Sequence, residues 1–137
     1  MSVVKELIRT EVDGTISFGN YELDKKSKVK DFEHNGDLYK VKTFKEITKL
    51  ERNDMFVYES VPGTAVFNLT TVNGGLEFAV EGKEDAQIAV ELEEAKEYEI
   101  FVNDNSIGQM KTNLGGKLVF SIELENLDIV AVKIVKL

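Results

Sequence analysis

The chain has 137 residues, a net charge of −8, 42% hydrophobic residues and 31% charged residues. This length is typical of one domain or of two very small ones, and the composition is that of a globular protein. Without cysteine and with a single histidine, the chain cannot hold disulfides, thiolate metal sites or a multi-histidine metal centre. The acidic balance also argues against nucleic acid as a partner, because nucleic-acid binders present a basic face.

The first 62 residues predict a smaller β-rich region. Asp13-Gly14 and Asn35-Gly36 are typical of tight hairpin turns between apolar segments. Residues 43–46, Thr-Phe-Lys-Glu, match a capping box and precede apolar residues at helical spacing, so a short helix near 44–52 competes with a strand there. Pro62-Gly63 is a turn signal, and we place the boundary between regions 1–62 and 63–137 at this point.

Residues 63–137 predict an antiparallel β-sandwich. In residues 117–124, large apolar side chains alternate with Lys, Val, Ser and Glu, which is the period of a strand with one buried face. Similar short runs recur at 65–69, 76–80, 88–92, 98–102, 107–112 and 130–134. This spacing favours an immunoglobulin-like or fibronectin-like sandwich, and a partly open barrel is the alternative.

The N-terminal residues and the length of the apolar runs indicate the expected cellular compartment. The N-terminal residues lack the basic segment and long apolar core of a signal peptide. No apolar run approaches the roughly 20 residues that a membrane-spanning helix needs. We therefore expect a cytoplasmic protein without a membrane partner, with export by a route that uses no cleaved signal as the alternative.

The titratable residues indicate no specific catalytic chemistry. His34 lies beside the Asn35-Gly36 turn, and we expect it to be a solvated turn residue rather than a general base. Nine acidic residues lie between Glu77 and Glu99, which favours a solvated face, with a cationic partner or Ca²⁺ as the alternative. Pairs of carboxylates are too numerous to identify a glycosidase site. We expect no cofactor, and we assign no catalytic residue and no metal ligand.

Four aromatic residues are the candidate binding residues. Tyr21, Tyr39, Tyr58 and Phe101 could project opposite to the core faces of their strands. Exposed aromatic rings stack on the apolar faces of sugars, and they also mark subunit interfaces. Contact with another subunit, packing against the N-terminal region and contact with a sugar are the three interpretations.

Four stretches of the sequence carry a resemblance to a known family. They are ISFGNY at 16–21, FEHNGDLYKV at 32–41, MFVYESVPGTAV at 55–66 and KTNLGGKL at 111–118. Over essentially the whole chain they resemble a family of short bacterial proteins carried under the label "endosialidase". The resemblance implies an association with sialic acid or with phage tails. It implies no catalytic residue, because the β-propeller of true endosialidases needs several four-stranded blades.

Three classes of function follow from these observations. A non-catalytic β-sandwich module for interaction or assembly comes first, and its partner would be a second copy of the chain, as a homo-oligomer, or another protein. A carbohydrate-binding module, with a ligand related to sialic acid, is the second. A small glycan hydrolase is the third. The lining of the largest cavity should discriminate between them, because each class needs a different set of side chains.

Overall fold

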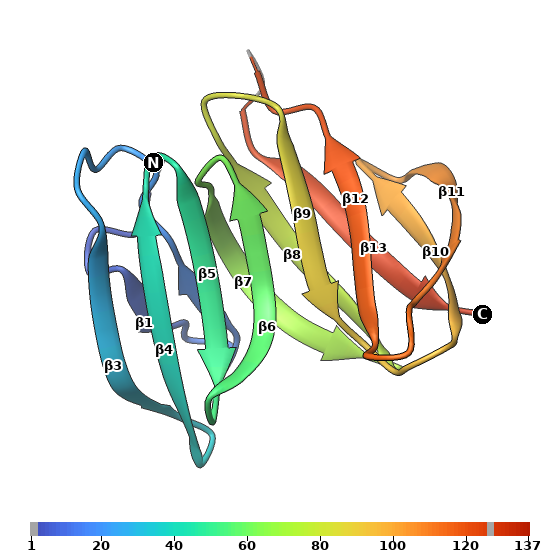
Figure 1. Ribbon diagram of the computed structural model, residues 1–137, viewed down its shortest axis with the longest axis horizontal. Coiled ribbons are helices and arrows are strands. Elements are labelled where there is room, and N and C mark those ends of the chain that lie inside the picture. Colours follow the sequence, from blue (N-terminus) through green and yellow to red (C-terminus); the bar gives the residue numbers. More distant parts are fainter. Residues whose placement is uncertain (1–2, 126–127) are drawn as a thin grey trace.

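The computed structural model describes residues 3–125 and 128–137 (Figure 1). These residues form thirteen β-strands and no helix, so none of them belongs to a helix that could cross a membrane. The strands are β1 (Ile8–Thr10), β2 (Ile16–Phe18), β3 (Ser27–His34), β4 (Asp37–Phe44), β5 (Ile47–Arg52), β6 (Met55–Val61), β7 (Ala65–Val72), β8 (Gly75–Glu81), β9 (Ala86–Glu91), β10 (Glu97–Val102), β11 (Asn105–Lys111), β12 (Lys117–Ile122) and β13 (Val130–Lys136).

The strands form two sheets that pack face to face. The seven-stranded sheet has the order β1-β2-β7-β8-β13-β10-β11, and the six-stranded sheet has the order β12-β9-β6-β5-β4-β3. Every hydrogen-bonded neighbour is antiparallel. In Figure 1 the six-stranded sheet lies in front of the other. The predicted all-β, antiparallel sandwich is confirmed.

The alternation of apolar residues places the core between the sheets. In β12, Leu118, Phe120 and Ile122 are buried, while the intervening residues are exposed. The same pattern in the other strands of both sheets assembles one main cluster of buried side chains. Because successive side chains of a strand point to opposite faces, this period of two predicted the buried face of β12 correctly.

Both sheets run across the boundary that we placed between residues 62 and 63. Strand β2 pairs with β7, and β6 pairs with β9. Aromatic rings also meet across the boundary: Tyr58 contacts Phe78 edge to face, with ring centroids 5.8 Å apart. The two regions therefore share both sheets and one core.

The helix considered near 44–52 is wrong, because these residues form a strand hairpin. Strand β4 ends at Phe44, and β5 begins at Ile47 and pairs with it throughout. The Thr43 hydroxyl caps no helix. It lies 2.8 Å from the Thr48 hydroxyl and accepts a hydrogen bond from the backbone N–H of Asn20 at 2.9 Å. Strand pairing satisfies the backbone groups here, and the apolar residues alternate as a strand requires.

Candidate functional site

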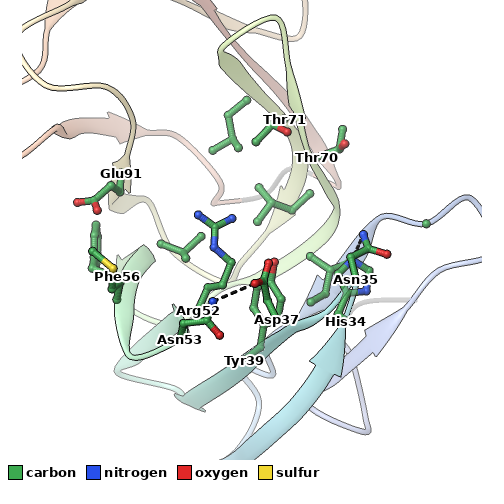
Figure 2. A pocket seen from close by; sticks show the side chains of 16 residues that line it. His34, Asn35, Asp37, Tyr39, Arg52, Asn53, Phe56, Thr70, Thr71 and Glu91 are labelled. Carbon is green, nitrogen blue, oxygen red and sulfur yellow. Dashed lines mark hydrogen bonds between the residues drawn. The ribbon is translucent and has the colours of Figure 1, made fainter.

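One end of the sandwich is open and forms a cleft of about 450 Å³ between the two sheets (Figure 2). The size lies within the range of roughly 300–1,000 Å³ that is usual for small-ligand pockets. Strands β2, β7 and β8 supply one wall, and β3, β4, β5, β6 and β9 of the six-stranded sheet supply the other. This end cleft is lined by Gly14, Ile16, His34, Asn35, Asp37, Tyr39, Arg52, Asn53, Met55, Phe56, Val57, Leu69, Thr70, Thr71, Leu76 and Glu91.

Arg52 is the main cationic group of the end cleft. It ends β5 two residues after the buried Leu50, so its side chain leaves the strand on the inner face. Figure 2 shows its guanidinium in the space between Phe56 and Glu91 on one side and Thr70 and Thr71 on the other. Within the described part of the chain it forms no hydrogen bond or ion pair, which leaves its donors free for a ligand.

The other arginine of the chain is bound differently. Arg9 donates a hydrogen bond to Glu11 at 2.9 Å and lies 3.4 Å from Glu6. The hydrogen bond to Glu11 is the main cause of the raised pKa of Arg9. Arg9 therefore has a structural role on the surface, whereas Arg52 has no such partner.

Two turns are tied together at the mouth of the end cleft. The Asn53 side chain donates to the Asp37 carboxylate at 2.9 Å and accepts from the Leu38 backbone N–H at 3.0 Å. The Asn53 backbone N–H donates to the Leu38 carbonyl oxygen at 2.7 Å. These bonds hold the β3–β4 turn against the β5–β6 turn. They also bind the Asp37 carboxylate to an amide rather than to Arg52.

His34 is buried, so the expectation of a solvated turn residue is wrong. Its side chain is 7% exposed, because it points inward at the end of β3 and packs edge to face on Tyr39. The Asn35 amide nitrogen lies 3.2 Å from Nε2, and the Thr10 hydroxyl lies 2.9 Å from Nδ1. Both ring nitrogens are occupied, and His34 is a rigid part of the wall.

The four aromatic candidates do not form a platform. Tyr58 is fully buried in the main core, and Tyr21 is 8% exposed in a second apolar cluster. Tyr39 is also 8% exposed but forms part of the end cleft. Phe101 is half-buried in a separate hollow on the outer face of the seven-stranded sheet. The prediction that Tyr21, Tyr39 and Tyr58 project outward is therefore wrong.

A β-bulge explains the placement of Tyr58. Leu50 pairs with Tyr58, but the next residue, Glu51, pairs with Phe56, so Val57 is an extra residue in β6. An extra residue on one strand changes which side chains face the core. Beyond the bulge, Tyr58 points inward, opposite the buried Leu50.

Sequence reasoning missed two side chains of the end cleft, Arg52 and Phe56. Arg52 carried one signal, because it is one of only two arginines among the 17 basic residues. No sequence signal pointed to Phe56, because its place at the rim of the end cleft depends on the bulge in β6. The Lys117 ammonium, which comes from β12, lies 4.7 Å from the centre of the Phe56 ring.

The end cleft offers binding groups of three kinds. Arg52 can hold an anion in a bidentate manner, Thr70 and Thr71 add hydroxyls, and Tyr39 and Phe56 add ring surface. No group of three or more His, Asp or Glu side chains in residues 3–125 and 128–137 could hold a metal ion. The lining also contains two acidic side chains, Glu91 and Asp37, and the Asp37 carboxylate is bonded to Asn53.

Comparison with known proteins found no match. No family model fits the chain, and no curated protein or solved structure is significantly similar to it.

Proposed function

We propose that the chain is a non-catalytic binding module whose end cleft holds an acidic sugar. The observation that carries this proposal is the guanidinium of Arg52, an exposed residue that lines a cleft of about 450 Å³ and has no side-chain partner among residues 3–125 and 128–137. A guanidinium in a partly enclosed cleft binds a carboxylate with two parallel hydrogen bonds, which fixes the orientation of the ligand as well as its charge.

The rest of the lining suits a sugar better than a purely apolar acid. A pyranose carries hydroxyls around its rim and C–H groups on its faces. Thr70 and Thr71 can hydrogen-bond the hydroxyls, and Leu69, Leu76 and the Tyr39 ring provide apolar surface for the faces. The resemblance to the family labelled "endosialidase" is consistent with an acidic sugar of the sialic acid type.

Calorimetric titration with N-acetylneuraminic acid, glucuronic acid and neutral N-acetylglucosamine tests this proposal. We expect both acids to bind and the neutral sugar to bind at least tenfold more weakly, because one charged hydrogen-bonding group is worth about tenfold in affinity. Arg52→Gln should weaken binding of the acids to the level of the neutral sugar. Arg52→Lys keeps the charge and loses the bidentate geometry, so it should bind with intermediate affinity.

Lys111→Gln is the matched control, because it removes one positive charge from an exposed position on β11, outside the end cleft. This variant should bind like the wild-type chain. The proposal would be contradicted if acidic and neutral sugars bound with equal affinity. It would also be contradicted if the acids bound Arg52→Gln as tightly as the wild-type chain.

A second candidate function, self-assembly, is favoured by the free edge of β12. Among the residues that the structure describes, this six-residue edge strand pairs with β9 alone, and its Val119 is 42% exposed. The other edges are protected: β1 has three residues, and β3 and β11 each contain a bulge next to their neighbour. An unprotected edge is a template for pairing with another strand.

Sedimentation of the chain over a range of concentrations tests this second candidate. We expect a concentration-dependent dimer, because two β12 edges can pair as antiparallel strands. Val119→Lys places a charge in the centre of the edge and should yield a monomer, whereas the exposed Leu114→Lys, outside the strands, should not. A wild-type chain that stays monomeric at high concentration excludes edge pairing.

A further inference from the structure

Three lysines stand directly opposite one another on the outer face of the six-stranded sheet. Lys28 of β3 pairs with Lys42 of β4, and Lys42 pairs with Lys49 of β5. Directly paired residues of antiparallel strands point to the same face, with Cβ atoms about 5 Å apart. The pairing register therefore places three ammonium groups in one row on a protein whose net charge is −8.

A small hollow lies within this row. It has a volume of about 90 Å³ and is lined by Lys28, Lys40, Lys42, Lys49 and Glu51. We call it the lysine hollow. It lies on the outside of the sheet and shares no lining residue with the end cleft.

The lysine hollow carries an excess of positive charge. Glu51 is its one acidic lining residue and lies 3.2 Å from Lys40 and 3.6 Å from Lys49. Lys28 and Lys42 form no ion pair with any carboxylate in the described ranges. The lining residues, four lysines and one glutamate, carry a formal charge of three, and Glu59 of β6 pairs with Lys49 next to the hollow.

The row of lysines lowers the folding stability of the protein when no ligand is bound. Like charges directly opposite each other on neighbouring strands repel. Burial, followed by the charges of Lys26, Lys49 and Lys28, lowers the pKa of Lys42, which means that its charged form is disfavoured there. A bound anion would remove this penalty.

Protection of the sheet edge explains the presence of only one of the three lysines in the row. Natural edge strands often carry lysine to prevent pairing with another chain, and Lys28 lies on the edge strand β3. Lys42 and Lys49 lie on β4 and β5, which are paired on both sides. An interior row of like charges needs a different reason.

We propose that the lysine hollow binds a doubly charged tetrahedral oxyanion, phosphate or sulfate, either free or as a monoester. Its volume of about 90 Å³ is well above the roughly 10–15 Å³ that one water molecule needs, so it has room for a group of several heavy atoms. Each lysine ammonium offers three hydrogen-bond donors, and four lysines surround the space. Bonds between charged donors and charged acceptors are the strong ones.

Titration with sodium sulfate, followed by backbone amide NMR shifts, tests the proposal, because sulfate keeps two charges throughout the neutral pH range. Sodium chloride at equal ionic strength is the reference. We expect saturable shifts at residues 28, 40, 42 and 49 with sulfate and none with chloride. Lys42→Gln and Lys49→Gln should each weaken the binding of sulfate about tenfold, because each removes one charged donor.

Lys111→Gln removes the same charge from β11 and should bind sulfate like the wild-type chain. Equal weakening in Lys111→Gln, or shifts with chloride equal to those with sulfate, would overturn the proposal, because the effect would then come from net charge alone. The fold of each variant is checked by the dispersion of its amide spectrum.

A second series identifies the source of the oxyanion. It compares inorganic phosphate with glucose 6-phosphate under the same conditions. Tighter binding of the monoester, lost in Lys42→Gln, indicates a phosphorylated molecule as the ligand. Tighter binding of inorganic phosphate indicates the free ion. If sulfate binds but neither phosphate displaces it, the site holds sulfate, free or as a monoester, and phosphate is excluded as the ligand.

Discussion

The phenolic oxygen of Tyr58 lies 2.8 Å from the hydroxyl oxygen of Thr64, inside the core and out of contact with water. The Ser60 hydroxyl lies at the same distance from the Thr64 hydroxyl. The backbone N–H and carbonyl of Thr64 both bond the Thr48 hydroxyl. Thr64 follows the turn that joins the two sheets, so this buried network fixes that crossing.

The network predicts different costs for two substitutions. Tyr58→Phe removes one hydroxyl and leaves the Thr64 hydroxyl bonded to Ser60, which should cost about 1 kcal/mol of unfolding free energy. Thr64→Val leaves the hydroxyls of Tyr58 and Ser60 without this partner and should cost about 2 kcal/mol or more. Urea denaturation measures both. A smaller loss in Thr64→Val than in Tyr58→Phe would contradict the assigned network.

Gly75 lies where β8 approaches the backbone of β13. A Cβ atom at this position would be 2.0 Å from the Ile134 carbonyl oxygen, and the backbone would have to move. We expect Gly75→Ala to lower the free energy of unfolding by about 3 kcal/mol, as overpacking in a core does. In Gly115→Ala the nearest atom to the new Cβ is 3.4 Å away, so this control should stay within about 1 kcal/mol of wild type. Thermal unfolding distinguishes them, and equal Tm values would refute the close approach.

The hydrogen bonds of Asp85 predict how the stability of the protein changes at acidic pH. Its carboxylate accepts hydrogen bonds from the backbone N–H groups of Leu124 and Glu125 at 2.9 and 3.0 Å, and these bonds lower the pKa of Asp85. A carboxylate with a lowered pKa in the folded state adds stability above its ordinary pKa. That stability is lost as the pH falls through the folded value.

Asp85→Asn cannot titrate, so its unfolding free energy should fall less than that of the wild-type chain between pH 7 and about pH 3. Urea midpoints across this range provide the measurement. Glu84→Gln removes a neighbouring acidic group that makes no hydrogen bond with the described residues, and it should follow the wild-type curve. The prediction fails if the two variants lose stability in parallel.

The lysine row predicts a gain in stability on removal of charge. Lys42→Gln should raise the unfolding free energy by about 0.2–1 kcal/mol at low salt, because it removes repulsion from Lys28 and Lys49. The gain should shrink at high salt, which screens exposed charges. Lys40→Gln loses an ion pair with Glu51 at 3.2 Å and should bring no gain. Denaturation at two salt concentrations measures the unfolding free energy of both variants. A loss of stability in both would contradict repulsion among the three lysines.

Some turns could be predicted from the sequence because their chemistry is local. Asn35 and Gly36 both have positive φ angles, as the Asn-Gly pair indicated, and they join β3 to β4. The hairpin of β4 and β5 could not be predicted, because Thr43 and Glu46 also match a capping box. Pairing with β4 along the whole length of β5 decided against the helix.

The candidate sites depended almost wholly on register. The alternation in β6 did not reveal the bulge at Val57, so Tyr58 was expected outside and lies inside. Nothing in the sequence indicated that Lys28, Lys42 and Lys49 would share one row, since they come from three different strands. Arg52 was visible only as a rare residue type.

The sequence by itself determined the all-β class, the antiparallel arrangement and the tight Asn-Gly turns, since a period of two and Gly-containing turns act over a few residues. The tertiary structure decided which strands are neighbours, where the bulges lie and which charges meet. The physical reason is that strand pairing joins residues far apart in the chain, and a shift of one residue moves every side chain to the opposite face. The end cleft around Arg52 and the lysine hollow around Lys42 both follow from that pairing.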